Sequence, residues 1–280
     1  MNENAYSAIM PASEAAIMHN TQVKIYPDGV RVLVADRPIF RERGWEEQRR
    51  SAPAELPEGS EEGPRDPAAR ERENIERSKR RARAAVYDLA RCTDFRYFVT
   101  LTVSPEKVDR LDDEAVFRKL HNWLDNHVRR NGLSYILVPE YHKKGGLHFH
   151  AFFNGALPVI DSGTLSVPGV KKPRRPRSEA ERRRLLDEGA HVVYNLPAWS
   201  LGFTTAIELY GSRSAAVGYV CKYITKAEKK IGGRWYYSGG DLRRPDVQFA
   251  DTDFSEAAAK AGSSFELEEL GCRCCRYEEE

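Results

Sequence analysis

The sequence predicts an α+β fold, in which a central antiparallel sheet of about five strands carries helices on its faces. Three observations predict this class. Runs rich in β-branched and aromatic residues at 97–103, 134–142 and 147–153 do not alternate with helices as in a parallel α/β fold. The last two runs are only four residues apart, which suits an antiparallel hairpin. The chain has 280 residues, of which 41% are hydrophobic, so it can form a sizeable core.

The elements of the first half follow from local patterns. Two alternating runs around Pro27, Asp28 and Gly29 predict a β-hairpin over 22–36. A stretch rich in Pro, Gly and charge at 50–75 is typical of a linker, and a helix is expected from about residue 67 to residue 92. After the strand at 97–103, Asp112 or Asp113 can cap a helix that ends before Gly132.

The second half begins with the hairpin of strands 134–142 and 147–153. Residues 158–190 then form a long interruption with the basic run KKPRRPR at 171–177. We expect a basic insertion loop there, whose cations either contact a nucleic-acid backbone or are simply solvated. A strand over 204–210 and a helix over 211–230 complete the predicted elements.

Charge divides the chain into three segments. Residues 1–63 form an acidic accessory segment with the hairpin and linker, residues 64–250 form the main domain, and residues 251–280 form an acidic tail that we expect to be disordered. The net charge of +2 hides 34 basic and 22 acidic residues in the main domain. This imbalance favours a phosphate-rich partner.

The chain also lacks the marks of export or membrane insertion. No apolar run reaches the roughly 18 residues that a membrane span needs. The N-terminus carries no positive charge ahead of its short apolar patch, so it is a poor signal peptide. We expect a cytoplasmic protein with no membrane partner.

The motif HFH places two histidines on one face of a strand. His148 and His150 are two residues apart, so their side chains point the same way and can hold one divalent metal ion. Glu140 on the neighbouring strand is the expected third ligand and favours Mg²⁺ or Mn²⁺. His142 is the alternative ligand and favours a softer metal. Two structural histidines without a metal would give the same pattern.

A second group of polar residues lies on the predicted helix over 211–230. Tyr219 and Tyr223 are four residues apart, as are Lys222 and Lys226, so all four lie on one side of the helix. A phenol among ammonium groups can attack a phosphate as phenolate. The alternative is that the tyrosines cover a core edge beside solvated lysines.

The ordered set of these motifs resembles a known family. TLT at 100–102, HFH at 148–150 and YVCKYITK at 219–226 resemble the three motifs of rolling-circle replication initiators of the HUH endonuclease superfamily. The paired tyrosines resemble the two-tyrosine type found in replication proteins of single-stranded DNA phages. The resemblance covers about residues 95–230 and implies an HUH/RRM-like endonuclease core.

The resemblance implies a role for each matching position. His148 and His150 match the metal-binding histidines, and Glu140 lies where such families often place a third ligand. Tyr219 and Tyr223 match the nucleophiles. Two further pairs match accompanying positions: Lys222 and Lys226 near the phosphate, and Thr100 and Thr102 in or near the site.

The implied activity is site-specific nicking and rejoining of single-stranded origin DNA. It proceeds by metal-dependent transesterification through a 5′-phosphotyrosine, with Mg²⁺ or Mn²⁺ as cofactor. Host DNA polymerase and helicase are the implied partners, in the cytoplasm of a prokaryotic cell.

Three other functions stay open on the sequence. A two-tyrosine transposase would share the motifs. A non-catalytic protein that binds single-stranded nucleic acid would use the sheet and basic loops without forming an adduct. An unrelated metallohydrolase would use the two histidines without the tyrosines. A relaxase is disfavoured, because its tyrosine usually precedes the histidines.

Overall fold

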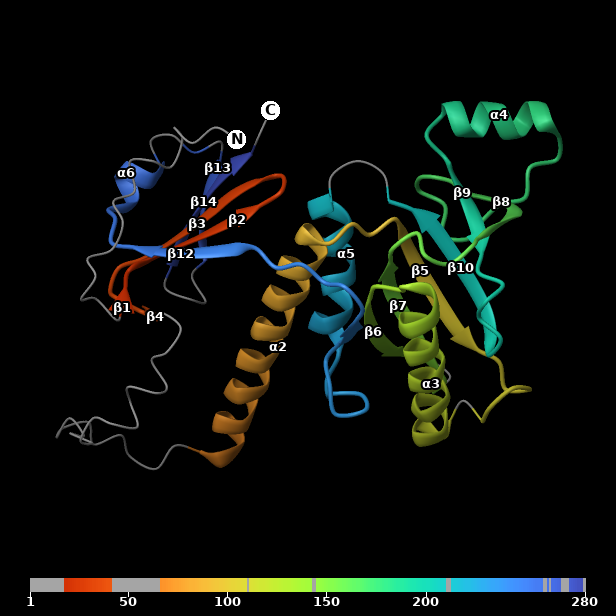
Figure 1. Cartoon of the computed structure of the whole chain (residues 1–280), viewed down its shortest axis with the longest axis horizontal. Helices are drawn as coiled ribbons and strands as arrows, with labels where there is room; N and C mark the ends of the chain where they lie inside the picture. The colour runs from red at the N-terminus through yellow and green to blue at the C-terminus, as the bar shows by residue number, and fades with distance from the viewer. Residues whose placement is uncertain are drawn as a thin grey trace. The chain divides into compact units, whose positions relative to one another are not determined.

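The structure is a computed structural model that describes residues 18–41, 66–109, 111–142, 145–209, 213–258, 261, 263–267 and 272–278. The chain divides into two compact units, one formed by Ala68–Arg243 and one formed by Met1–Pro67 with Arg244–Glu280. Helices and antiparallel sheets are both present, so the predicted α+β class is confirmed (Figure 1). No helix in the described residues is both long and apolar enough to cross a membrane.

The larger unit contains a seven-stranded sheet with the strand order β11-β6-β7-β5-β10-β9-β8. Every neighbouring pair in it is antiparallel. The alternation of buried and partly exposed residues along β5 shows that its two faces have different surroundings. The strands are β5 (Tyr97–Val103), β6 (Tyr135–Tyr141), β7 (Leu147–Phe153), β8 (Ile160–Ser166), β9 (His191–Asn195), β10 (Gly202–Glu208) and β11 (Tyr237–Gly239).

Helix α3 (Asp113–Asn131) covers one face of this sheet. The side chain of Asp112 caps its N-terminus by accepting a hydrogen bond from the Ala115 amide, and Gly132 ends it with a φ of 70°. Its buried side chains Phe117 and Leu120 belong to the same core as Leu101 and Phe149 of the sheet. The predicted helix and its caps are confirmed.

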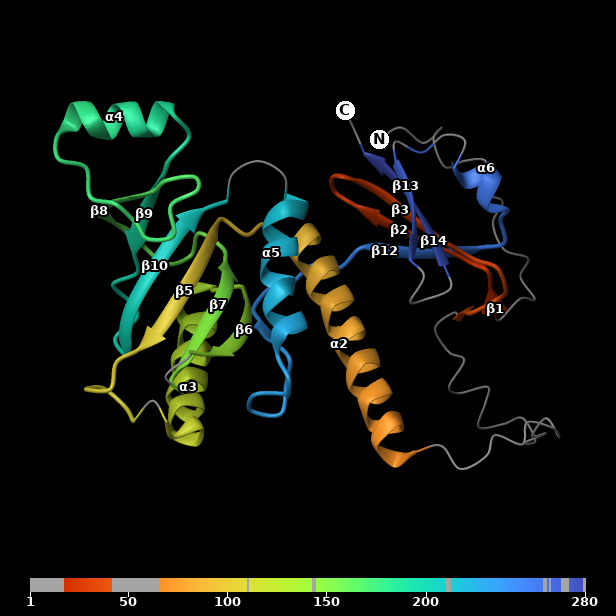
Figure 2. The same cartoon turned by 180° about the vertical axis from the view of Figure 1, so that it is seen from behind.

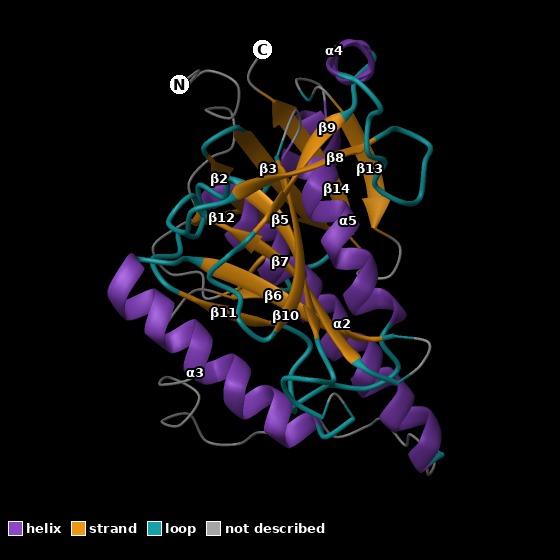
Figure 3. Ribbon diagram, turned by 90° about the vertical axis from the view of Figure 1, so that its right-hand side faces the viewer, coloured by secondary structure: helices purple, strands orange, loops and turns teal. Residues whose placement is uncertain are grey.

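Helices α2 (Pro67–Cys92) and α5 (Arg213–Lys226) cover the opposite face. Figures 1 and 2 both show α5 between α2 and the sheet, and Figure 3 shows α3 on the other side of the strands. The core on this side joins α2, α5 and strands β6 and β7. Its buried members include Val86, Leu89, Val217, Val220, Ile224, Ile136, Val138 and Phe152.

The long insertion after β7 is folded, which differs from the loop that the sequence predicted over 158–190. It contains β8, helix α4 (Glu179–Asp187) and the start of β9, and Leu165, Leu185 and Ala190 form a small core of its own. The backbone of Arg174 pairs with Leu165 in both directions at 2.8 Å. Short elements among many charged residues leave no clear periodicity, which is why the pattern missed them and why the sheet has more than five strands.

The smaller unit contains a five-stranded sheet with the order β12-β2-β3-β14-β13. The predicted hairpin is confirmed as β2 (Thr21–Tyr26) and β3 (Gly29–Ala35). The rest of the unit consists of β1 (Met18–His19), β4 (Phe40–Arg41), β12 (Asp246–Ala250), α6 (Phe254–Ala258), β13 (Ser263–Leu267) and β14 (Cys272–Glu278).

The C-terminal segment differs from the disordered tail that its acidic composition predicted. β14 pairs with β3 along the whole length of both strands, and β13 pairs with β14. The predicted division into 1–63, 64–250 and 251–280 therefore differs from the structure, where both ends of the chain belong to one unit. β14 finds its partner β3 more than two hundred residues away, so no local pattern reveals this pairing.

Candidate functional site

The candidate site lies on the sheet face that also carries α5. Residues paired directly across antiparallel strands point to the same face. In register, Glu140 of β6 pairs with His148 of β7, and His148 pairs with Thr102 of β5. One row further along, His150 pairs with Thr100. The hairpin therefore brings the two histidines and Glu140 to one face, as the strand period predicts.

His150 is held by contacts on both ring nitrogens. Its Nε2 lies 2.8 Å from Oε2 of Glu140, and its Nδ1 lies 3.5 Å from the hydroxyl of Thr100. A carboxylate only accepts, so Nε2 carries the proton and Nδ1 accepts from the threonine. Burial lowers the pKa of His150, although the bond to Glu140 opposes this shift. The ring is thus a neutral imidazole at neutral pH, the form that can ligate a metal.

His148 is more open and has aromatic and polar neighbours. Its Nδ1 lies 3.5 Å from the hydroxyl of Thr102. Its ring centroid lies 5.0 Å from that of His142 and 6.2 Å from that of His150. The predicted alternative ligand His142 is thus beside His148, while Glu140 contacts His150.

Tyr223 reaches the histidines from α5. Its ring stacks on His150 with centroids 3.7 Å apart and an interplanar angle of 11°. Lys226 lies nearly one turn further along, with its Nζ 5.8 Å from the centre of the Tyr223 ring. Apolar residues Val220 and Ile224 on the same helix are fully buried, and their packing fixes the helix face that carries Tyr223.

The other predicted helix residues are only partly covered by the structure. Tyr219 lies on α5, one turn before Tyr223, but its side chain is outside the described residues. Lys222 is exposed on the same helix. The structure therefore brings together His148, His150, Glu140, Tyr223 and Lys226.

The donor set suits a divalent cation, although the described side chains do not form a closed metal site. Among the described residues, no three His, Cys, Asp or Glu side chains are grouped closely enough to hold an ion. One carboxylate and two imidazoles on one face are nevertheless the ligand types that accept Mn²⁺ or Mg²⁺ and leave other positions for phosphate oxygen. The residues present fit such an ion chemically.

A pocket of about 320 Å³ opens beside Glu140 and Tyr223. Its size is at the lower end of the range for small-ligand sites. Lys226 and Lys229 contribute positive charge to its wall, and Glu140 and Glu228 contribute negative charge. The remaining lining residues are Pro139, Tyr141, Ala227 and Ile231.

Sequence reasoning missed two aromatic residues on this face. The ring of Phe98 on β5 lies parallel to His150, with centroids 6.1 Å apart and an angle of 3°. Phe203 on β10 pairs with Thr102 and extends the row of site residues by one strand. Phe98 could have been found from the period of two that links it to Thr100 and Thr102, whereas Phe203 depended on the strand order.

The fold and the site define an α+β protein with a His, Glu and Tyr cluster on the face of an antiparallel sheet. A family model for the replication-associated protein ORF2 matches residues 96–228. This range contains the whole cluster, and the match supports a replication initiator that binds DNA. Comparison with curated proteins and with solved structures gave no match.

Proposed function

We propose that this protein initiates rolling-circle replication by nicking single-stranded origin DNA and later rejoining it. The observation that carries the proposal is the stacking of Tyr223 on His150, which in turn is bonded to Glu140. A helix tyrosine is thereby packed against a strand histidine of the HFH motif. A core that needed only to bury a tyrosine would not require a buried imidazole bonded to a carboxylate beneath it.

The chemistry is a transesterification at phosphorus. The Oη of Tyr223 or Tyr219 attacks the scissile phosphate and forms a new P–O bond, while the bond from phosphorus to the 3′-oxygen breaks. The phenol proton is transferred, through solvent or a basic side chain, to the departing 3′-oxygen. The products are a 5′-phosphotyrosine and a free 3′-OH. The number of phosphoester bonds is unchanged, so the reverse reaction rejoins DNA without ATP.

The side chains of the site divide this work. Packing on α5 holds Tyr223 beside the histidines, and Lys226 adds a positive charge that attracts the phosphate. Thr100 and Thr102 orient His150 and His148 through their Nδ1 atoms. His148, His150 and Glu140 would hold Mg²⁺ or Mn²⁺, which when bound supplies Lewis-acid polarisation of the phosphate.

Two tyrosines one turn apart on α5 suit a reaction that must cut twice. While one tyrosine carries the 5′ end, the other remains to attack the junction regenerated after one round of synthesis. The free 3′ end then primes synthesis by a host polymerase, and a host helicase separates the strands.

The test is covalent adduct formation with single-stranded DNA that spans the origin, in the presence of Mn²⁺. The wild-type chain should yield a protein–DNA band that resists denaturation, and excess chelator should abolish it. Tyr223→Phe with Tyr219→Phe should remove the band. Tyr194→Phe, a tyrosine of β9 on the opposite sheet face beside Tyr97, is the matched control and should keep it.

The outcomes separate the rival functions. An adduct that survives in the double tyrosine variant refutes the nucleophile assignment. Binding without an adduct in the wild type indicates a non-catalytic single-strand-binding protein. Adduct formation on transposon ends instead of a replication origin indicates a two-tyrosine transposase.

A further inference from the structure

Part of the site face is left open by the helices. α5 packs over β6 and β7, through Ile136, Val138 and Phe152. On β5 and β10 the same face keeps accessible side chains. Phe203 and Thr205 are exposed there, and Phe98, Thr100, Thr102 and Ile207 are partly exposed.

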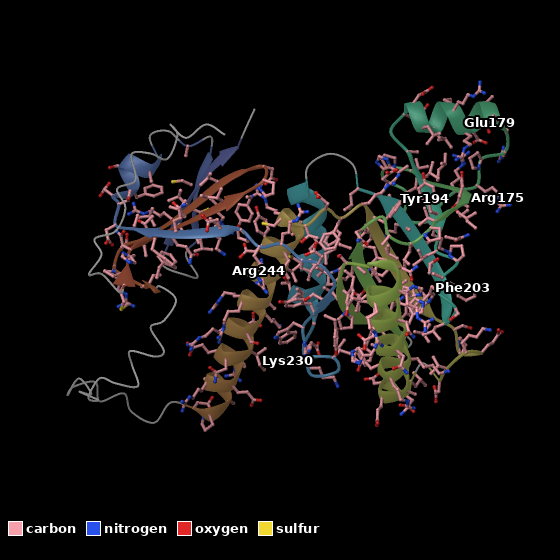
Figure 4. All side chains as sticks on the ribbon, viewed as in Figure 1. Arg175, Glu179, Tyr194, Phe203, Lys230 and Arg244 are labelled. Carbon is pink, nitrogen blue, oxygen red and sulfur yellow. The ribbon has the colours of Figure 1, made fainter. Side chains whose placement is uncertain are left out.

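Phe203 stands in one row with the candidate catalytic residues. It pairs with Thr102, which pairs with His148, which pairs with Glu140, so this row crosses four strands on one face. Since neighbouring strands lie about 4.8 Å apart, the backbone of Phe203 is about 10 Å from that of His148. Figure 4 labels Phe203 on β10, apart from α5.

The exposure of Phe203 is high for an aromatic side chain within a sheet. It is 71% exposed, the largest fraction among the exposed large hydrophobic residues that the structure describes. Thr205, the next residue of β10 on the same face, is polar, so the strand itself does not demand an apolar side chain here. A rigid, solvent-facing ring beside threonine hydroxyls is suited to stacking on a flat ligand.

The backbone beneath Phe203 is fixed by its neighbour Gly202. A Cβ at Gly202 would lie 2.1 Å from the carbonyl oxygen of Thr102 and 2.6 Å from the amide nitrogen of Ser104. Only a residue without a side chain allows β10 to approach β5 this closely. The ring of Phe203 is thus carried on a closely paired strand and not on a loop.

We propose that Phe203 is a stacking platform for a base of single-stranded DNA next to the scissile phosphate. The inference rests on the proposed function, because it assumes that a phosphate lies at His150 and Tyr223. DNA that leaves this point toward β6 meets the covered part of the face, whereas DNA that leaves toward β10 crosses the open part. Every base presents a π-face, so this contact contributes affinity with little dependence on sequence.

The test measures binding and cleavage separately on one origin oligonucleotide. Phe203→Ala should raise the Kd for single-stranded DNA about 5- to 150-fold, the range for loss of one base–aromatic stack. Phe203→Trp should restore binding, and its fluorescence should be quenched when the oligonucleotide binds. Ile160→Ala is the matched control, because Ile160 is a 60% exposed apolar residue on β8 of the same sheet, and its Kd should stay at the wild-type value.

A scan with single abasic nucleotides locates the stacked base. One abasic position near the cleavage point should weaken binding of the wild type, and the same position should have no further effect on Phe203→Ala, because both changes remove one contact. Equal Kd values for the wild type and Phe203→Ala overturn the inference. So does a scan in which the effects of the two changes simply add.

The proposed function fails independently of this result. If the wild type forms the adduct and Phe203→Ala binds normally, the inference fails and the function stands. If binding depends on Phe203 but no adduct forms, the platform stands and the nicking activity fails. Absence of any binding to single-stranded DNA overturns both.

Discussion

The packing of α5 predicts how strongly a single core substitution disturbs the site. Ile224 is fully buried between α5 and the sheet and is adjacent in sequence to Tyr223. Ile224→Ala removes three carbons, which lowers the free energy of unfolding by about 2.4 kcal/mol through lost burial at ~0.8 kcal/mol each. The cavity that remains brings the loss to about 3 kcal/mol. For a unit of this size, the melting temperature should fall by about 6–12 °C.

Thermal unfolding followed by circular dichroism measures this effect. Ile224→Val should retain most of the stability, since one lost methyl group costs about 1 kcal/mol. Thr225→Ala is the control on the same helix. Thr225 is exposed and donates to the carbonyl of Cys221 within α5, so the change should stay within about 0.5 kcal/mol of wild type. A melting temperature of Ile224→Ala within about 2 °C of wild type would refute the packing described for α5.

Two further predictions concern charge and titration. If the basic run of the insertion contacts DNA, replacing Lys171 and Lys172 with Ala should reduce the slope of log K against log salt for single-stranded DNA by about 1.4, and an unchanged slope means that these lysines are only solvated. Burial raises the pKa of Cys221 to about 11, so its reactive thiolate forms only as pH rises toward that value. At pH 8, alkylation of Cys221 followed by peptide mass spectrometry should be about 100-fold slower in the folded chain than in urea, whereas equal rates would contradict its burial.

The sequence alone determined the features that depend on local spacing. Helix α3 is bounded by Asp112 and Gly132, because a capping carboxylate and a left-handed glycine act within one turn. The shared face of His148 and His150 follows from the period of two along a strand. The four-residue connection between their strands already implied that Glu140 would lie near them.

The tertiary structure alone decided which distant segments meet. The contact between Tyr223 and His150 depends on the packing of α5 on β6 and β7, and no spacing along the chain fixes that distance. Phe203 joins the site row only because β10 pairs with β5. The acidic C-terminal segment becomes strands β13 and β14 because β3 offers an edge to it. Local periodicity reports how a segment folds, whereas pairing between segments depends on the free energy of the whole assembly, which a pattern of neighbouring residues does not contain.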